Sequence, residues 1–99
     1  NVYVPNVFWP GNPGGLNDHF NPQIGRGVER VNYMRIYDRW GALMYSREDF
    51  FPNNDNLAEG WDGKYKGDYV NPAVFVYVIE VVFLDGKVLT YRGDVTVVR

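Results

Sequence analysis

The sequence predicts an all-β domain, an immunoglobulin-like or fibronectin-type β-sandwich of about seven short strands. Two long stretches, Val28 to Asp38 and Ala73 to Leu84, are rich in the β-branched and aromatic residues that strands favour. Eleven glycines and six prolines supply tight turns between such strands. No stretch repeats apolar residues with the period of 3.6 that an amphipathic helix requires.

The length and charge of the chain exclude several classes of protein. Ninety-nine residues are enough for one domain with one hydrophobic core, and we expect residues 1–99 to form it. The net charge of −2 provides no attraction for nucleic acid or for an anionic membrane. No apolar run approaches the roughly 18 residues of a membrane-spanning helix. Because the chain starts at Asn1 rather than at a methionine, we expect it to be part of a longer protein.

The residue types that catalyse reactions are scarce in this chain. Cysteine is absent, which excludes disulfides, thiolate metal sites and thiol nucleophiles. The one histidine, His19, follows a loop, and the one serine, Ser46, lies near the end of a strand. No motif joins them to an acid as a catalytic triad would require. We therefore predict that the domain is not an enzyme.

The N-terminal third predicts short strands separated by a long loop. Val2 to Val4 form a strand that Pro5 stops, because proline has no N–H to donate to a neighbouring strand. Asn6 to Trp9 resume the strand. Glycine and proline dominate residues 10–18, which excludes regular structure there. Phe20 follows as an apolar anchor.

The hairpin from Met34 to Tyr45 is the predicted centre of the fold. Alternation leads to Asp38, and Gly41 supplies the positive φ that a chain reversal needs. We expect Ile36 in the core and Trp40 covering one end of it. A long polar loop follows, and the tight Gly60-Trp61-Asp62-Gly63 segment then fixes Trp61, which we also place in the core.

The last long strand has two faces. Alternation places Phe75, Tyr77 and Ile79 on the core face, with Val74, Val76 and Val78 on the outer face. Glu80 identifies the second face as the outer one. Its valines make that face unusually apolar for a surface.

The closing hairpin has a predicted register. Asp85-Gly86 is typical of a two-residue turn, which pairs Phe83 with Val88. Continued without change, this register sets Tyr77 against a charged residue. A β-bulge at Arg92-Gly93 restores an apolar match by pairing Tyr77 with Val95.

Two features allow ligand binding. Asn17 and Asp18 follow a glycine-rich loop and offer oxygen ligands for calcium, as does a second cluster formed by Asn53, Asn54, Asp55, Asn56, Glu59 and Asp62. The alternative is that these side chains cap turns. The three tryptophans, Trp9, Trp40 and Trp61, suit a sugar-stacking platform, although burial at the ends of the core is the usual role of tryptophan.

Six ordered segments resemble the gliding-motility-associated C-terminal domain, the type B sorting domain of the Bacteroidetes type IX secretion system. Ile36-Tyr37-Asp38-Arg39-Trp40-Gly41 resembles its Ile-Tyr-Asn-Arg-Trp-Gly block, and Trp61-Asp62-Gly63 resembles its Trp-Asp-Gly block. The others are Val4 to Phe8, Leu16 to Phe20, Ala73 to Ile79, and Asp85 to Lys87 with Gly93 to Arg99. The resemblance covers nearly the whole chain.

The chain departs from that family at its first loop. The family pattern there is Pro-Asn-Gly-Asp-Gly, whereas residues 10–15 are Pro-Gly-Asn-Pro-Gly-Gly, one residue longer and without the acid. This difference weakens the calcium hypothesis for Asn17 and Asp18. Ala73 also replaces a family glycine.

The resemblance implies a non-catalytic sorting domain at the C-terminus of a larger secreted or surface protein. Such a domain is recognised in the periplasm and directs export across the outer membrane, so the implied partners are the type IX machinery, an outer-membrane β-barrel and the attached cargo. We place the recognition surface on the final hairpin, at Val74, Val76, Val78, Val95, Val97 and Arg99. The alternatives are an accessory sandwich that binds carbohydrate or calcium within a secreted enzyme or adhesin, and an inert spacer.

Overall fold

A computed structural model describes residues 2–11, 19–24, 27–51 and 60–98, and these ranges contain nine strands and no helix. The prediction of an all-β fold is confirmed. The long strands are β4 (Val28–Tyr37), β5 (Leu43–Phe50), β8 (Ala73–Phe83) and β9 (Val88–Val97). The other five have two residues each: β1 (Val2–Tyr3), β2 (Val7–Phe8), β3 (Gln23–Ile24), β6 (Lys64–Tyr65) and β7 (Asp68–Tyr69).

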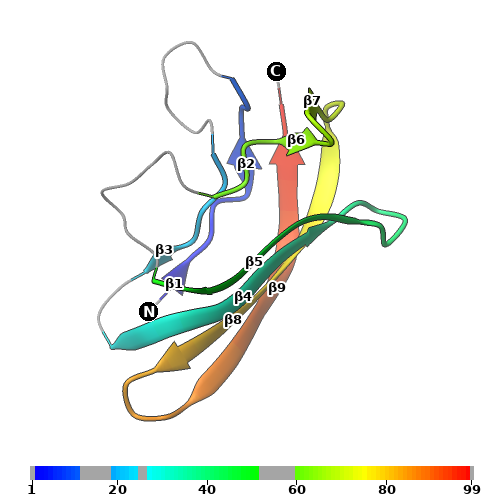
Figure 1. Cartoon of the computed structure of the whole chain (residues 1–99). Coiled ribbons are helices and arrows are strands. Elements are labelled where there is room, and N and C mark those ends of the chain that lie inside the picture. The colour runs from blue at the N-terminus through cyan, green and yellow to red at the C-terminus, as the bar shows by residue number, and fades with distance from the viewer. Residues whose placement is uncertain (1, 12–18, 25–26, 52–59, 99) are drawn as a thin grey trace.

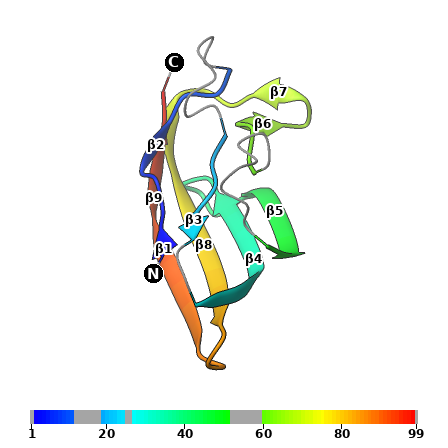
Figure 2. The ribbon, with the colours of Figure 1, turned by 90° about the vertical axis from the view of Figure 1, so that its left-hand side faces the viewer.

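The strands form a sandwich with unequal layers. One five-stranded sheet has the order β2-β9-β8-β4-β5, and two small sheets pair β1 with β3 and β6 with β7. The long strands make one twisted sheet, and the N-terminal segment and the small sheets lie against one of its faces (Figures 1 and 2). The opposite face is therefore the outer face of the domain.

The first strand is divided between the two layers at Pro5. Before the proline, β1 pairs antiparallel with β3. After it, β2 pairs parallel with β9, with Val7 beside Thr96 and Phe8 beside Val97. Proline lacks the N–H that a continuous ladder needs, so it suits the point at which the chain leaves one sheet for the other. The predicted interruption at Pro5 is confirmed.

The core is an aromatic cluster between the layers. The Trp61 ring lies 5.3 Å from the rings of both Phe8 and Phe75, and Phe20 lies 5.9 Å from Phe8 and 5.7 Å from Tyr77. These contacts join Phe20 and Trp61, which lie outside the long sheet, to Phe8, Phe75 and Tyr77 within it. Aliphatic side chains from the long strands complete the core: Val31, Met34, Ile36, Ile79, Val81, Val95 and Val97.

Five of the six predicted core residues lie in or against this cluster. Ile36, Trp61, Phe75 and Ile79 are buried, and Tyr77 is partly buried against them. The placement of Trp40 in the core was wrong, because 81% of its surface is exposed. Trp40 stands in the turn between β4 and β5, and a residue at the tip of a turn projects beyond the sheet.

The register of the last hairpin also differs from the prediction. Gly86 donates to the carbonyl of Phe83 (2.9 Å) and Phe83 donates to that of Lys87 (2.8 Å), so the loop has three residues, 84–86. Gly86 has a φ of 91°, as the last residue of such a loop requires. The β8–β9 pairing then continues without a shift, and the bulge expected at Arg92-Gly93 is absent.

The pairing explains why residue 93 is a glycine. Gly93 lies directly opposite Tyr77 in the sheet, and a Cβ atom on it would approach the Tyr77 hydroxyl oxygen to 2.5 Å. The tyrosine ring occupies the space that a side chain would need. The glycine that suggested a bulge in the sequence instead makes room for the cross-strand tyrosine.

Candidate functional site

The outer face of the long sheet carries the three valines that the sequence singled out. Val74 is 47% exposed and Val76 is 36% exposed, while Val78 is half-buried. Cross-strand pairing extends this apolar region to the edge of the sheet, because Val74 pairs with Thr96 and Thr96 with the exposed Val7. We call Val7, Val74, Val76 and Val78 the valine strip.

A polar network borders the valine strip on the same face. Asn32 donates its side-chain amide to Glu80 (2.9 Å), and the Arg35 guanidinium lies 4.1 Å from the Tyr33 ring centroid and 3.6 Å from the Glu48 carboxylate. Glu80 therefore lies on the outer face, as expected. The outer face is polar over the middle of β4 and apolar near the start of β8.

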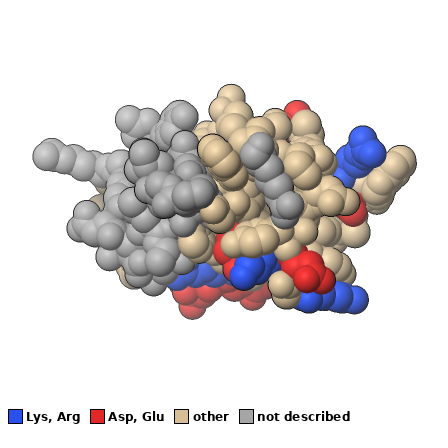
Figure 3. Space-filling view, turned by 90° about the horizontal axis from the view of Figure 1, so that it is seen from above, with Lys and Arg blue, Asp and Glu red and all other residues tan. Residues whose placement is uncertain are grey.

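Charges of both signs are mixed over the surface. In the view from above, Lys and Arg lie beside Asp and Glu along one side of the molecule, and neutral residues fill most of the described surface (Figure 3). No broad field of one sign is visible there. This distribution agrees with the small net charge of −2.

Two residues assigned to the recognition surface lie inside the protein. Val95 is 0% exposed and Val97 is 1% exposed. Their placement on the surface was wrong, since Val95 pairs with Phe75 and both side chains point into the core. Residues directly opposite in a sheet share a face, and the expected pairing of Val95 with the core-face residue Tyr77 already conflicted with a surface position. Arg99 lies outside the described residues.

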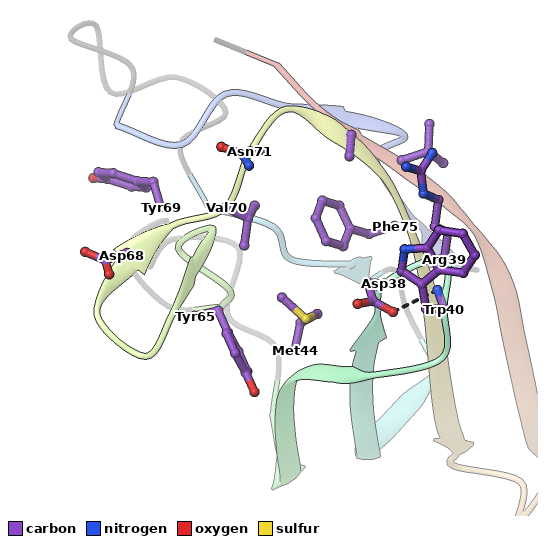
Figure 4. A pocket seen from close by; sticks show the side chains of 12 residues that line it. Asp38, Arg39, Trp40, Met44, Tyr65, Asp68, Tyr69, Val70, Asn71 and Phe75 are labelled. Carbon is purple, nitrogen blue, oxygen red and sulfur yellow. Dashed lines mark hydrogen bonds between the residues drawn. The ribbon is translucent and has the colours of Figure 1, made fainter.

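A second feature is an open hollow of about 390 Å³ beside the β4–β5 turn. Met44, Val70 and Phe75 lie at its centre, between the Asp38 to Trp40 segment and the tyrosines of the β6–β7 hairpin (Figure 4). Its lining residues are Asp38, Arg39, Trp40, Met44, Tyr65, Asp68, Tyr69, Val70, Asn71, Ala73, Val74 and Phe75. Val74 belongs to both features, so the hollow adjoins the valine strip.

Asp38 holds Trp40 at the rim of the hollow. Its Oδ1 accepts the backbone N–H groups of Trp40 (2.8 Å) and Ala42 (2.9 Å). The Arg39 guanidinium lies 5.3 Å from the centre of the Trp40 ring, within the range of a cation–π contact. The turn thus presents an exposed indole in a defined position.

The β6–β7 hairpin supplies the tyrosines of the hollow. Lys66 has a φ of 53° and Gly67 a φ of 89°, as in a two-residue type I′ turn. Tyr65 pairs with Asp68 across that turn. Sequence reasoning missed the contribution of Tyr65 and Tyr69 to a surface site, and Lys66-Gly67 was the local indication of a turn.

Trp61 is unavailable for any sugar-stacking platform. It is 0% exposed, its Nε1 donates to the Lys64 carbonyl (3.1 Å), and its backbone pairs with that of Phe20. Gly60 and Gly63 flank it with φ values of 106° and 79°, and a Cβ at Gly63 would meet Pro10. The segment 60–63 therefore fixes a core residue, whereas Trp9 and Trp40 are 41% and 81% exposed.

The described residues give no support to catalysis or metal binding. Ser46 pairs with Arg35 within the sheet, whereas His19 precedes the contact between Phe20 and Trp61. No group of three or more His, Cys, Asp or Glu side chains suited to a metal occurs in the part of the chain that the structure describes. Asn17, Asp18 and residues 53–56 lie outside that part. No helix in the described ranges is long and apolar enough to cross a membrane.

A family model for the CHU_C type IX secretion signal domain matches residues 2–97. The chain belongs to this family. No curated protein and no solved structure matches the chain. The resemblance seen in the sequence is confirmed, and it implies export out of the cell by the type IX system.

The segments that resemble the type IX secretion signal domain serve mainly to build its core. Phe8, Phe20, Trp61 and Phe75 come from four different segments and meet in the aromatic cluster. These segments determine the fold. Among the described residues, the valine strip and the hollow are exposed features outside that core.

Proposed function

We propose that this domain directs the export of an attached protein across the outer membrane, and that the type IX machinery recognises it in the periplasm as a folded, non-catalytic domain. The family match over residues 2–97 carries this proposal. A folded core supports recognition of a surface, because the aromatic cluster holds segments distant in sequence in one arrangement. The expected partners are an outer-membrane β-barrel of the machinery and the attached cargo.

We assign the recognition surface to Val74, Val76 and Val78. Exposed apolar residues that are contiguous on a protein surface mark interaction sites more often than isolated ones do. Here Thr96 lies between Val74 and Val7 on this face, and Asp94 and Arg92 of β9 lie directly opposite Val76 and Val78 at the border of the strip. The strip therefore has the apolar centre and polar rim of a protein interface.

A fusion experiment tests this function. Residues 1–99 are joined to a periplasmic reporter in a cell with an active type IX system, and the reporter is measured at the cell surface and in the medium. We expect export of the fusion, and retention when the last few residues are deleted. Retention of both fusions in the periplasm would show that the domain is not a sorting domain.

Charge substitutions test the surface itself. Val74→Lys and Val76→Lys should leave the fold intact because both side chains are partly exposed, and should reduce export about tenfold by placing charge in an apolar interface. Leu84→Lys is the matched control, because Leu84 is an exposed apolar residue in the β8–β9 turn. Equal export of all three variants would remove the valine strip from the proposal.

A second candidate function is carbohydrate binding at the hollow. An exposed indole, two tyrosines and the side chains of Asp68 and Asn71 combine aromatic surface with planar polar groups, which suits a sugar ring. Binding to a soluble glycan library should then be lost with Trp40→Ala and retained with Trp9→Ala. Absence of binding by the unaltered domain would exclude this candidate.

A further inference from the structure

Among the described residues, the edge of β9 that faces away from β8 is unpaired along most of its length. The short β2 pairs only with its end, where Thr96 donates to the Asn6 carbonyl (2.8 Å) and Val98 donates to the Phe8 carbonyl (3.0 Å). From Val88 to Asp94, no strand within the described ranges pairs with that edge. Figures 1 and 2 show β2 against the part of β9 nearest the C-terminus.

The direction of the unpaired donors follows from the register. Successive N–H groups along a strand point to opposite sides, and the pairing of β9 with β8 has no shift between Val88 and Val97. Thr90, Arg92 and Asp94 therefore direct their N–H groups to the same side as Thr96 and Val98, away from β8. The free edge is a continuation of the edge that already accepts β2.

The two edges of the long sheet differ in how they resist pairing. On β5, three charged residues follow one another, Arg47, Glu48 and Asp49, and Asp49 has a φ of 52° that interrupts a regular strand. Charges and irregular backbone are devices that prevent strand addition. β9 has a regular register, its charged residues Arg92 and Asp94 are not consecutive, and Val88 and Leu89 expose 50% and 48% of their surface beside its free edge. The edge of β9 is thus the more receptive one.

We propose that the export machinery binds this domain by adding an extended strand to the free edge of β9 between Val88 and Asp94. This proposal rests on the proposed sorting function and specifies how the partner is recognised. Backbone hydrogen bonds would supply affinity, and side chains would supply specificity. The partner strand should place apolar residues beside Leu89 and Tyr91 on one face, and an acidic residue beside Arg92 on the other.

A pair of substitutions at one position separates backbone pairing from side-chain contact. Thr90→Pro removes an N–H that β8 does not use, and proline is tolerated on edge strands. Thr90→Ala removes the same side chain and keeps the N–H. Binding of the labelled domain to detergent-solubilised envelopes from type IX-competent cells should weaken about tenfold with Thr90→Pro and remain unchanged with Thr90→Ala. Envelopes from cells that lack the machinery provide the baseline.

Hydrogen exchange on the unaltered domain provides a test that needs no substitution. The amides of Thr90, Arg92 and Asp94 should exchange rapidly in the free domain and slowly in the bound one. The amides of the β5 edge should keep their rates. If Thr90→Pro lowers the melting temperature enough to unfold the domain, these exchange rates decide the question.

Several outcomes would overturn strand addition. Equal losses of binding with Thr90→Pro and Thr90→Ala would show that the side chain is recognised. If both variants bind as well as the unaltered domain, and the amides of Thr90, Arg92 and Asp94 exchange at the same rate in the free and bound domain, the edge is not used. A dimer of the domain alone that Thr90→Pro abolishes would make the edge a contact between two copies. The fusion experiment separates the two proposals: export of both unaltered and Thr90→Pro fusions would refute strand addition alone, whereas failure of the unaltered fusion would refute the sorting function.

Discussion

At the scale of single residues, the three tryptophans have different surroundings. Trp61 is buried in the aromatic cluster, and its indole N–H is bonded to the Lys64 carbonyl. Trp40 stands at the tip of a turn and Trp9 is partly exposed. Residue type alone does not distinguish these cases, because tryptophan has both a large apolar surface and a polar N–H.

Exchanging each of two tryptophans for alanine should give very different stabilities. Trp61→Ala removes the ring that joins Phe8 to Phe75 and should lower the free energy of unfolding by about 3–5 kcal/mol. Trp40→Ala removes an exposed ring and should change it by less than about 0.5 kcal/mol. Urea unfolding measures both, and similar losses for the two variants would contradict the burial described above.

Tyr77 should make stability depend on pH in alkaline solution. Burial raises the pKa of its hydroxyl above 10.0, and the negative charge of Asp94 raises it further. Above the unfolded pKa, the folded state therefore retains a proton that the unfolded chain has lost. The contribution of Tyr77 is complete below about pH 10 and is lost as the pH rises through the folded pKa.

The measurement is the difference between two proteins. The unfolding free energy of the unaltered domain should fall more steeply above pH 10 than that of Tyr77→Phe, which has no hydroxyl to titrate. Asp94→Asn should give an intermediate slope, because it removes only the smaller of the two causes. Parallel curves for the unaltered domain and Tyr77→Phe would show that its pKa is the same in both states.

At the scale of elements, two hairpins use the same turn. In the β4–β5 turn, Gly41 donates to the Asp38 carbonyl (3.0 Å) and Asp38 donates to the Ala42 carbonyl (2.9 Å). The β8–β9 turn repeats this pattern with Gly86, Phe83 and Lys87. In both, a glycine with positive φ is the last of three loop residues. Asp85-Gly86 predicted the hairpin correctly and its loop length wrongly, because an Asp-Gly pair fits loops of two or three residues.

Asp38 should contribute to the β4–β5 turn through its carboxylate. Asp38→Ala removes the acceptor of two backbone N–H groups and should lower the free energy of unfolding by about 0.5–1.5 kcal/mol, because water can replace the two lost hydrogen bonds in part. Asp38→Asn retains an oxygen in the same place and should cost less. Arg39→Ala, a change at an exposed neighbour in the same turn, should alter unfolding in urea by less than about 0.5 kcal/mol. A loss as large for Arg39→Ala would show that the carboxylate is not responsible.

At the scale of the whole molecule, one core connects the two layers. Phe20 and Trp61 lie outside the long sheet, whereas Phe8, Phe75 and Tyr77 come from its strands β2 and β8. The ion pairs Arg30–Asp49, Arg35–Glu48 and Lys87–Asp85 are all solvent-exposed and contribute little. Neither layer buries its apolar face without the other.

This arrangement predicts unfolding in a single step. In a Trp9→Phe, Trp40→Phe background, the fluorescence of Trp61 reports on the interface between the layers, while far-ultraviolet circular dichroism reports on the long sheet. The two urea transitions should coincide. A fluorescence transition at lower urea would indicate that the small layer separates before the sheet unfolds.

The sequence by itself determined the strand class, the interruption at Pro5, most of the core and the family. Each of these depends on local chemistry: side-chain alternation, the missing N–H of proline, and short motifs in a fixed order. The outer position of Val74, Val76 and Val78 also followed from alternation along one strand.

Only the tertiary structure decided the features that depend on contact between two segments, namely the register of paired strands and the exposure of side chains and strand edges. The one-residue difference in the β8–β9 loop set Phe75 rather than Tyr77 opposite Val95, and it set Gly93 opposite Tyr77, where the glycine makes room for the tyrosine ring. The exposure of Trp40 and the free edge of β9 depend on which segments lie beside them. Pairing between strands is a long-range interaction, and the alternation of side chains along one strand does not show which strand pairs with it or in which register.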